Sequence, residues 1–132
     1  MVKERIEWGL LCGRMILGII MLAHGIQKLG AMENTIAMFN KIGQPAALAY
    51  AAAIIEAIGG VFLITGIFVI PSAILLGLTM IGAIVLAKHQ MGLIGGYEFP
   101  LSLLGISVIL AFTGSRKFAI SEVITKKSRV TQ

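Results

Sequence analysis

Apolar residues along the chain gather in four long runs, separated by short stretches that carry most of the polar and charged residues. The runs cover about 8–29, 46–69, 72–88 and 97–114. Runs of about 20 apolar residues are typical of helices that cross a lipid bilayer. Pro45, Pro71 and Pro100 each lie near the start of a run, where the first amides of a helix have no intrahelical partner to lose. The pattern predicts an all-α integral membrane four-helix bundle, with 1–132 forming a single membrane domain.

The composition agrees with a protein whose surface lies in lipid. Hydrophobic residues make up 58% of the chain and charged residues only 13%, well below the roughly 25% that is usual in soluble domains. Between Lys41 and Lys88 the only charged residue is Glu56. A single cysteine, Cys12, excludes an intrachain disulfide. We therefore expect a multi-pass protein of the cell membrane, with the lipid bilayer as its first partner.

Basic residues concentrate near the two ends of the chain. Those flanking the termini are Lys3, Arg5, Arg116, Lys117, Lys126, Lys127 and Arg129. Cytoplasmic segments of membrane proteins carry such an excess, so we expect both termini, and the basic tail 115–132, in the cytoplasm. The net charge of +5 is then explained by topology and lipid headgroups, and no nucleic-acid partner is expected.

The first loop on the opposite side, 31–45, contains Ile36, Phe39 and Ile42 at roughly helical spacing, with polar residues between them. This spacing fits a short helix lying in the membrane interface. An ordinary loop with a few buried anchors explains it equally well, and the two alternatives remain open.

Ionisable side chains interrupt the first two spans. A charge at mid-membrane costs about 2.5 to 3.5 kcal/mol even on the mildest scale, so a functional site is the default hypothesis. At about 100° per residue, Arg14, His24 and Lys28 fall on one stripe of the first span, beside Gly25. Arg14 lies nearer the cytoplasmic side, where its long stem can reach the interface.

The second span carries Glu56 on a face of small residues that includes Gly59 and Gly60, which lets another helix approach. A rise of about 1.5 Å per residue places Glu56 level with His24. We therefore expect contact between His24 and Glu56, with Lys28 above them. We expect Lys88 to reach the same outer half of the bundle. Three further candidate ligand-binding residues lie there as well: His89, Tyr97 and Glu98.

Several of these residues lie in recognisable motifs. The segments "AHGIQKLG", "GQPA", "EAIGGVFLITGI" and "GGYEFPLSLLGISVILAFTG" resemble the DoxX family of small four-helix bacterial membrane proteins. The resemblance covers about 10–114 and implies a component of an oxidoreductase system, linked in some members to quinone-dependent sulfur oxidation and in others to oxidative or thiol stress. The matching positions are His24, Gly25, Lys28, Glu56, Gly59, Gly60, Gly96, Tyr97 and Glu98. The tail "SRKFAISEV" departs from the family's endings.

The leading hypothesis is a membrane subunit or accessory of an oxidoreductase system that binds a quinone or another small redox-active molecule. His24 and Glu56 would be its catalytic residues, exchanging protons with the ligand, while Lys28 would stabilise an oxyanion. The cofactor stays unknown. Haem between His24 and His89 is disfavoured because His89 lies at a helix end, and no metal-ligand spacing is present.

Two other classes of function remain open. The polar residues could hold the helices together in a non-enzymatic anchor or assembly factor, or they could serve a small proton-linked transporter. An oxidoreductase component requires a soluble or membrane redox partner, and a transporter this small requires a homo-oligomer.

Overall fold

The structure, a computed structural model, describes residues 1–131, and these form helices joined by short turns. Within them, four helical segments are long and apolar enough to cross a membrane: Val2–Gly30, Ala46–Thr65, Val69–Met91 and Leu93–Thr113. The predicted all-α membrane bundle is therefore confirmed. The first span begins earlier than predicted, because the polar stretch "VKERIE" continues the helix beyond its apolar part.

The spans are built from regular helices and, near one end of the bundle, from wider or tighter turns. The regular helices are α1 (Val2–Gly30), α2 (Met32–Lys41), α3 (Ala46–Thr65), α4 (Val69–Ala83), α5 (Glu98–Thr113) and α6 (Ile120–Val130). Between α4 and α5 lie the π-helical η1 (Ile84–Lys88), the 3-10 turn η2 (His89–Met91) and η3 (Leu93–Tyr97), a kinked segment in which Ile94 and Gly95 have non-helical backbone angles. Pro45 caps α3, while Pro71 and Pro100 lie in the first turns of α4 and α5, as predicted.

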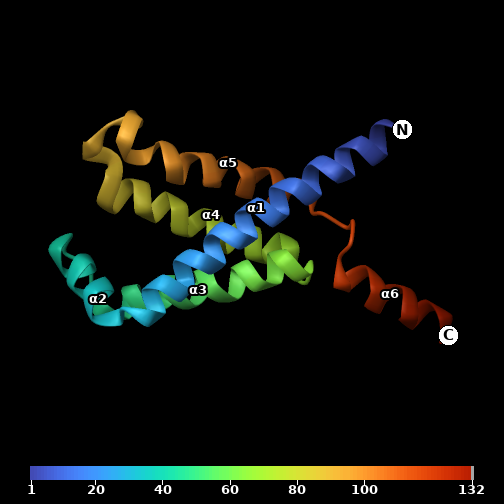
Figure 1. The fold of residues 1–132 in the computed structure, drawn as a ribbon, viewed down its shortest axis with the longest axis horizontal. Helices are drawn as coiled ribbons and strands as arrows, with labels where there is room; N and C mark the ends of the chain where they lie inside the picture. The colour runs from blue at the N-terminus through green and yellow to red at the C-terminus, as the bar shows by residue number, and fades with distance from the viewer. Residues whose placement is uncertain (132) are drawn as a thin grey trace.

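The helices pack as two pairs, α1 with α3 and α4 with α5. Buried apolar side chains between the pairs include Leu17 and Met21 of α1, Leu63 of α3 and Leu76 of α4. Many large apolar side chains remain exposed on the outside, which fits a surface in contact with lipid. Both termini lie at the same end of the bundle (Figure 1).

The turn between α3 and α4 sits at the end of the bundle where the termini lie. Gly66 ends α3 in the left-handed conformation, with φ of 78°, and its amide donates to the Phe62 carbonyl at 2.8 Å. From this turn α3 and α4 separate toward the opposite end, where α2 lies (Figure 1).

Two short helices flank the bundle. Of the two alternatives for the loop 31–45, the structure has the helix, α2, which packs mainly against α3. The basic tail also contains a helix that the sequence analysis did not predict, α6, which projects from the bundle at the end where the termini lie (Figure 1).

Candidate functional site

Glycines let α1 and α3 approach closely around the site. A Cβ added to Gly25 would lie 2.7 Å from the Cα of Ala57, and one added to Gly60 would lie 2.6 Å from the amide nitrogen of Leu22. Small residues at such crossings allow two backbones to pack in membranes. Gly59 faces α4 instead, where an added Cβ would lie 3.1 Å from Leu76.

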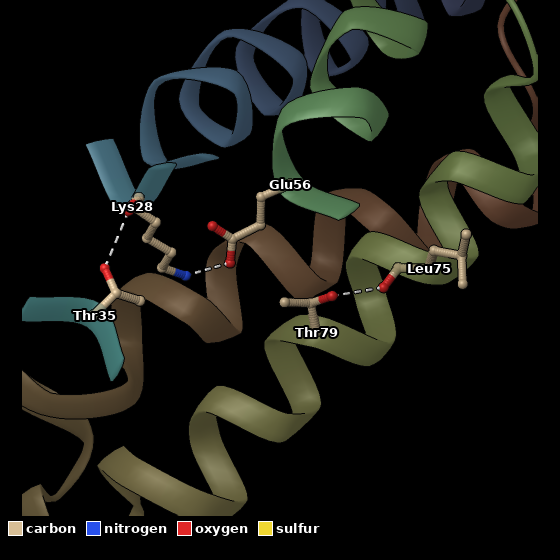
Figure 2. Close-up of polar contacts among 5 residues, drawn as sticks. All are labelled: Lys28, Thr35, Glu56, Leu75 and Thr79. Carbon is tan, nitrogen blue, oxygen red and sulfur yellow. Dashed lines mark hydrogen bonds and ion pairs between the residues drawn. The ribbon is translucent and has the colours of Figure 1, made fainter. Parts of the chain in front are cut away.

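This close approach places Lys28 of α1 beside Glu56 of α3 (Figure 2). Lys28 Nζ donates a hydrogen bond of 2.6 Å to Glu56 Oε1. The Glu56 side chain is 2% exposed, whereas that of Lys28 is 22% exposed. The hydroxyl of Thr35 donates to the Lys28 carbonyl at 3.3 Å, which ties α2 to the same turn (Figure 2). The ion pair therefore joins the first two spans near α2.

The second carboxylate oxygen of Glu56 is buried, and it has no hydrogen-bond partner within residues 1–131. Leaving a buried acceptor unsatisfied costs about 1 to 3 kcal/mol, and more when the group is charged. Such an oxygen can accept a hydrogen bond from any donor that reaches it. Glu56 is thus satisfied on one side by Lys28 and open to a further donor on the other.

A cavity of about 550 Å³ lies beside this ion pair, within the range of about 300 to 1,000 Å³ that is usual for small-molecule sites. Its walls come from α1 to α5 and from η1, and most of them are apolar. The lining residues with polar side chains are His24, Lys28, Glu56, Thr79 and Lys88. The Thr79 hydroxyl donates to the Leu75 carbonyl at 2.9 Å (Figure 2), so its donor is already used. The polar groups able to bind a ligand are therefore few.

The expected contact between His24 and Glu56 is not formed. The partner of the Glu56 carboxylate is Lys28, and the His24 ring lies against Phe99 with 5.7 Å between ring centroids. His24 is one turn of α1 closer to the middle of the span, and the longer lysine side chain reaches the carboxylate first. His24 still lines the cavity, half-buried in its wall.

Comparison with known proteins identifies the chain. A family model described as DoxX matches residues 9–89. A relative in Bacillus subtilis (strain 168), described as "Putative oxidoreductase CatD", is 41% identical over 125 residues, which cover 95% of this chain and 93% of the relative. The chain belongs to the DoxX family. No solved structure matches it.

The part of this DoxX protein matched by the family model contains the ion pair and both lysines of the cavity. Lys88 reaches the cavity from η1, the π-helical end of the third span. The neighbouring His89 is exposed and does not line the cavity. Tyr97 and Glu98 do not line it either, and Glu98 Oε1 accepts a hydrogen bond from the Gly95 amide at 2.9 Å. A role for these three residues in ligand binding stays a prediction.

Haem or metal binding gains no geometric support. Within residues 1–131, no three side chains of His, Cys, Asp or Glu gather as a metal site would require. His24 and His89 do not share the cavity wall from which both could face one haem.

Arg14 of this DoxX protein lies away from the cavity, and its guanidinium contacts the segment that follows the last span. Its side chain is 1% exposed. Nη1 donates to the carbonyl and the hydroxyl of Ser115 at 3.2 and 3.3 Å, and Nη2 donates to the Phe118 carbonyl at 3.3 Å. Arg14 is therefore a structural residue that holds the segment between α5 and α6 against α1.

The sequence analysis missed part of the cavity wall. Phe39 of α2, Thr79 of α4 and Phe99 of α5 all line it. The helical spacing of Ile36, Phe39 and Ile42 marked an apolar face on α2 without indicating what it covers. Nothing in the sequence around Thr79 distinguishes it from other residues in lipid-facing helices, and Phe99 lies in the quoted segment "GGYEFPLSLLGISVILAFTG" without having been assigned a role.

Proposed function

We propose that this protein is a membrane component of an oxidoreductase system, and that its cavity binds the head of a quinone-type molecule. Membership of the DoxX family and the description of its Bacillus subtilis relative support the oxidoreductase-associated role. The observation that carries the ligand proposal is the buried Glu56 Oε2, which has no hydrogen-bond partner within residues 1–131 and belongs to a residue that lines the cavity beside a lysine ammonium.

The residues of the cavity match the hydrogen-bonding groups of such a head. Glu56 Oε2 can accept a hydrogen bond from a ring hydroxyl, and Lys28 or Lys88 can donate to a ring oxygen. In a site with few water molecules, a carboxylate next to an ammonium can also accept a proton from the bound hydroxyl. Phe99 and Phe39 supply aromatic walls for a flat ring. When bound, the quinone-type molecule supplies two-electron transfer to or from a redox partner.

We also propose an orientation in the cell membrane. Both termini lie at one end of the bundle (Figure 1), and the basic residues that flank them favour the cytoplasm. The cavity, near α2 at the opposite end, is then in the outer half of the bilayer. Redox partners on the cytoplasmic side would meet α6 and the basic tail.

Equilibrium binding to protein reconstituted in lipid nanodiscs tests the proposal. The probe is a benzoquinol that carries no side chain. We expect Glu56→Gln to weaken binding by about tenfold or more, the value of one charge-assisted hydrogen bond. Glu33→Gln is the matched control, because Glu33 is exposed on α2 and does not line the cavity.

Two results would contradict the proposal. Binding that is equally strong in wild type and in Glu56→Gln would show that the carboxylate does not hold the ligand. Absence of binding in both proteins, with a lower unfolding temperature in Glu56→Gln, would favour the anchor or assembly factor, in which the ion pair only joins α1 and α3.

A further inference from the structure

We infer that the ligand of this cavity has a long apolar tail as well as a polar head, and that it enters sideways from the lipid between α3 and α4. This inference rests on the proposed function, since it assigns a ligand class and an entry route to the same cavity. The inference implies that the ligand reaches the cavity from the lipid phase and not from water.

The α3 wall of the cavity leads outward from the ion pair. At about 100° per residue, Ala52, Ile55 and Ala51 are turned about 40°, 100° and 140° away from Glu56 around the helix. Burial falls in the same order: Glu56 is buried, Ala52 and Ile55 are half-buried, and Ala51 is exposed. All four residues line the cavity. On this side the cavity therefore continues to the surface that faces the membrane.

The α4 wall has the same gradient. Met80 is buried and Thr79 is half-buried, whereas Leu75 and Leu78 are 48% and 58% exposed. All four line the cavity. The exposed lining residues Ala51, Leu75 and Leu78 thus form the outer edge of the cavity, and all three belong to membrane-spanning helices. An opening at this position faces hydrocarbon and not water.

The route from the aqueous side is covered. Met38 and Phe39 of α2, and Ile42 directly after it, line the cavity at the end of the bundle. A water-soluble ligand would have to pass this apolar cover, while a lipid-dissolved ligand would meet an open apolar edge. Among the polar lining residues Glu56 is the buried one, and the exposed lining residues Ala51, Leu75 and Leu78 are apolar, which matches a head bound near Glu56 and a tail leaving between α3 and α4.

The test compares two probes that share one quinone ring, one with a long isoprenoid tail and one with a methyl group in its place. Both are measured at equilibrium in nanodiscs of phosphatidylcholine. Ala51→Trp fills the proposed opening, and Ala23→Trp is the matched control, an exposed alanine of α1 outside the cavity lining. We expect Ala51→Trp to lower the affinity for the tailed probe by about tenfold or more and the affinity for the methyl probe by less than about twofold, since only the tail occupies the opening. Ala23→Trp should change neither.

A second pair of variants protects the test against a folding defect in Ala51→Trp. Leu78→Trp narrows the opening from α4, and Ile81→Trp is its control, since Ile81 is exposed but does not line the cavity. Equal weakening of both probes by Ala51→Trp and Leu78→Trp, or no weakening of either, would overturn lateral entry. Glu56→Gln separates the two proposals. If it leaves both probes unaffected, the proposed function fails; if it weakens both while the tryptophan variants weaken neither, only lateral entry fails.

Discussion

The ammonium of Lys28 lies 2.6 Å from one carboxylate oxygen of Glu56, while the other oxygen is buried and has no partner in the part of the chain that the structure describes. The ion pair is therefore asymmetric. The Lys28 side chain is partly exposed, whereas the Glu56 side chain is almost fully buried and relies on Lys28 for its counter-charge. Such a pair can join two helices and also present a free acceptor to a ligand. The two roles make different predictions, because only the first concerns stability in the absence of a ligand.

Removing Lys28 alone should destabilise the protein more than removing both charges. Lys28→Met leaves the buried Glu56 without its counter-charge, and breaking a buried pair in this way costs about 3 to 5 kcal/mol. We expect Lys28→Met with Glu56→Gln to recover a large part of that loss, because no uncompensated charge remains. Thermal unfolding of the two single variants and the double variant in nanodiscs gives the coupling free energy. Additive losses would show that the two side chains do not stabilise one another.

Gly25 should tolerate no side chain at all. A Cβ at this position would come within 2.7 Å of the Ala57 Cα, so α1 and α3 would have to move apart. Gly25→Val should therefore lower the free energy of unfolding by about 3 kcal/mol, the upper part of the usual range for overpacking. Gly105→Ala is the control, because nothing lies within 4 Å of its added Cβ. In α5 this control should stabilise the helix by about 0.5 to 1 kcal/mol, and similar losses in both variants would contradict the close crossing.

Arg14 should control the segment that leads to α6. Its guanidinium holds Ser115 and Phe118, so Arg14→Met should release residues 114–119 while leaving the four spans in place. Tryptic cleavage after Arg116 and Lys117 then becomes faster in the variant than in wild type. Arg5→Met, at an exposed position of α1, should not change the cleavage rate. Equal rates in wild type and Arg14→Met would mean that the segment is held by other contacts.

The fold could be predicted from the sequence because it depends mainly on the order and length of the apolar runs along the chain. Lipid requires long apolar helices, and the apolar runs and the prolines mark their extents. Two features were harder to see. The π-helical turn at Ile84–Lys88 has no sequence signature of its own. The helix α6 lies in a tail whose basic residues were interpreted only as a topology signal.

The site could be predicted only in part. The helical angle on α1 placed His24 and Lys28 on one face, and the estimated depth placed Glu56 nearby. The sequence therefore indicated that these three residues lie close together. It could not tell which of the two side chains pairs with Glu56, because that depends on how α1 and α3 are rotated against each other. The Gly25 crossing at Ala57 determines this rotation. The contacts of Arg14 could not be predicted for a related reason, since its partner carbonyls lie about 100 positions away along the chain.

The cover formed by α2 should govern how long a ligand stays in the cavity. Phe39 is half-buried and lines the cavity from α2, so Phe39→Ala removes an aromatic wall and opens the end of the bundle toward water. For the methyl-substituted quinone we expect dissociation to become about fivefold to thirtyfold faster, which corresponds to about 1 to 2 kcal/mol of lost apolar contact. Association should change less, since differences between related complexes arise mostly in dissociation.

Ile36→Ala is the control, because Ile36 is also half-buried on α2 but does not line the cavity. Equal dissociation rates from Phe39→Ala and Ile36→Ala, measured by stopped-flow displacement, would show that α2 does not cover the bound ligand.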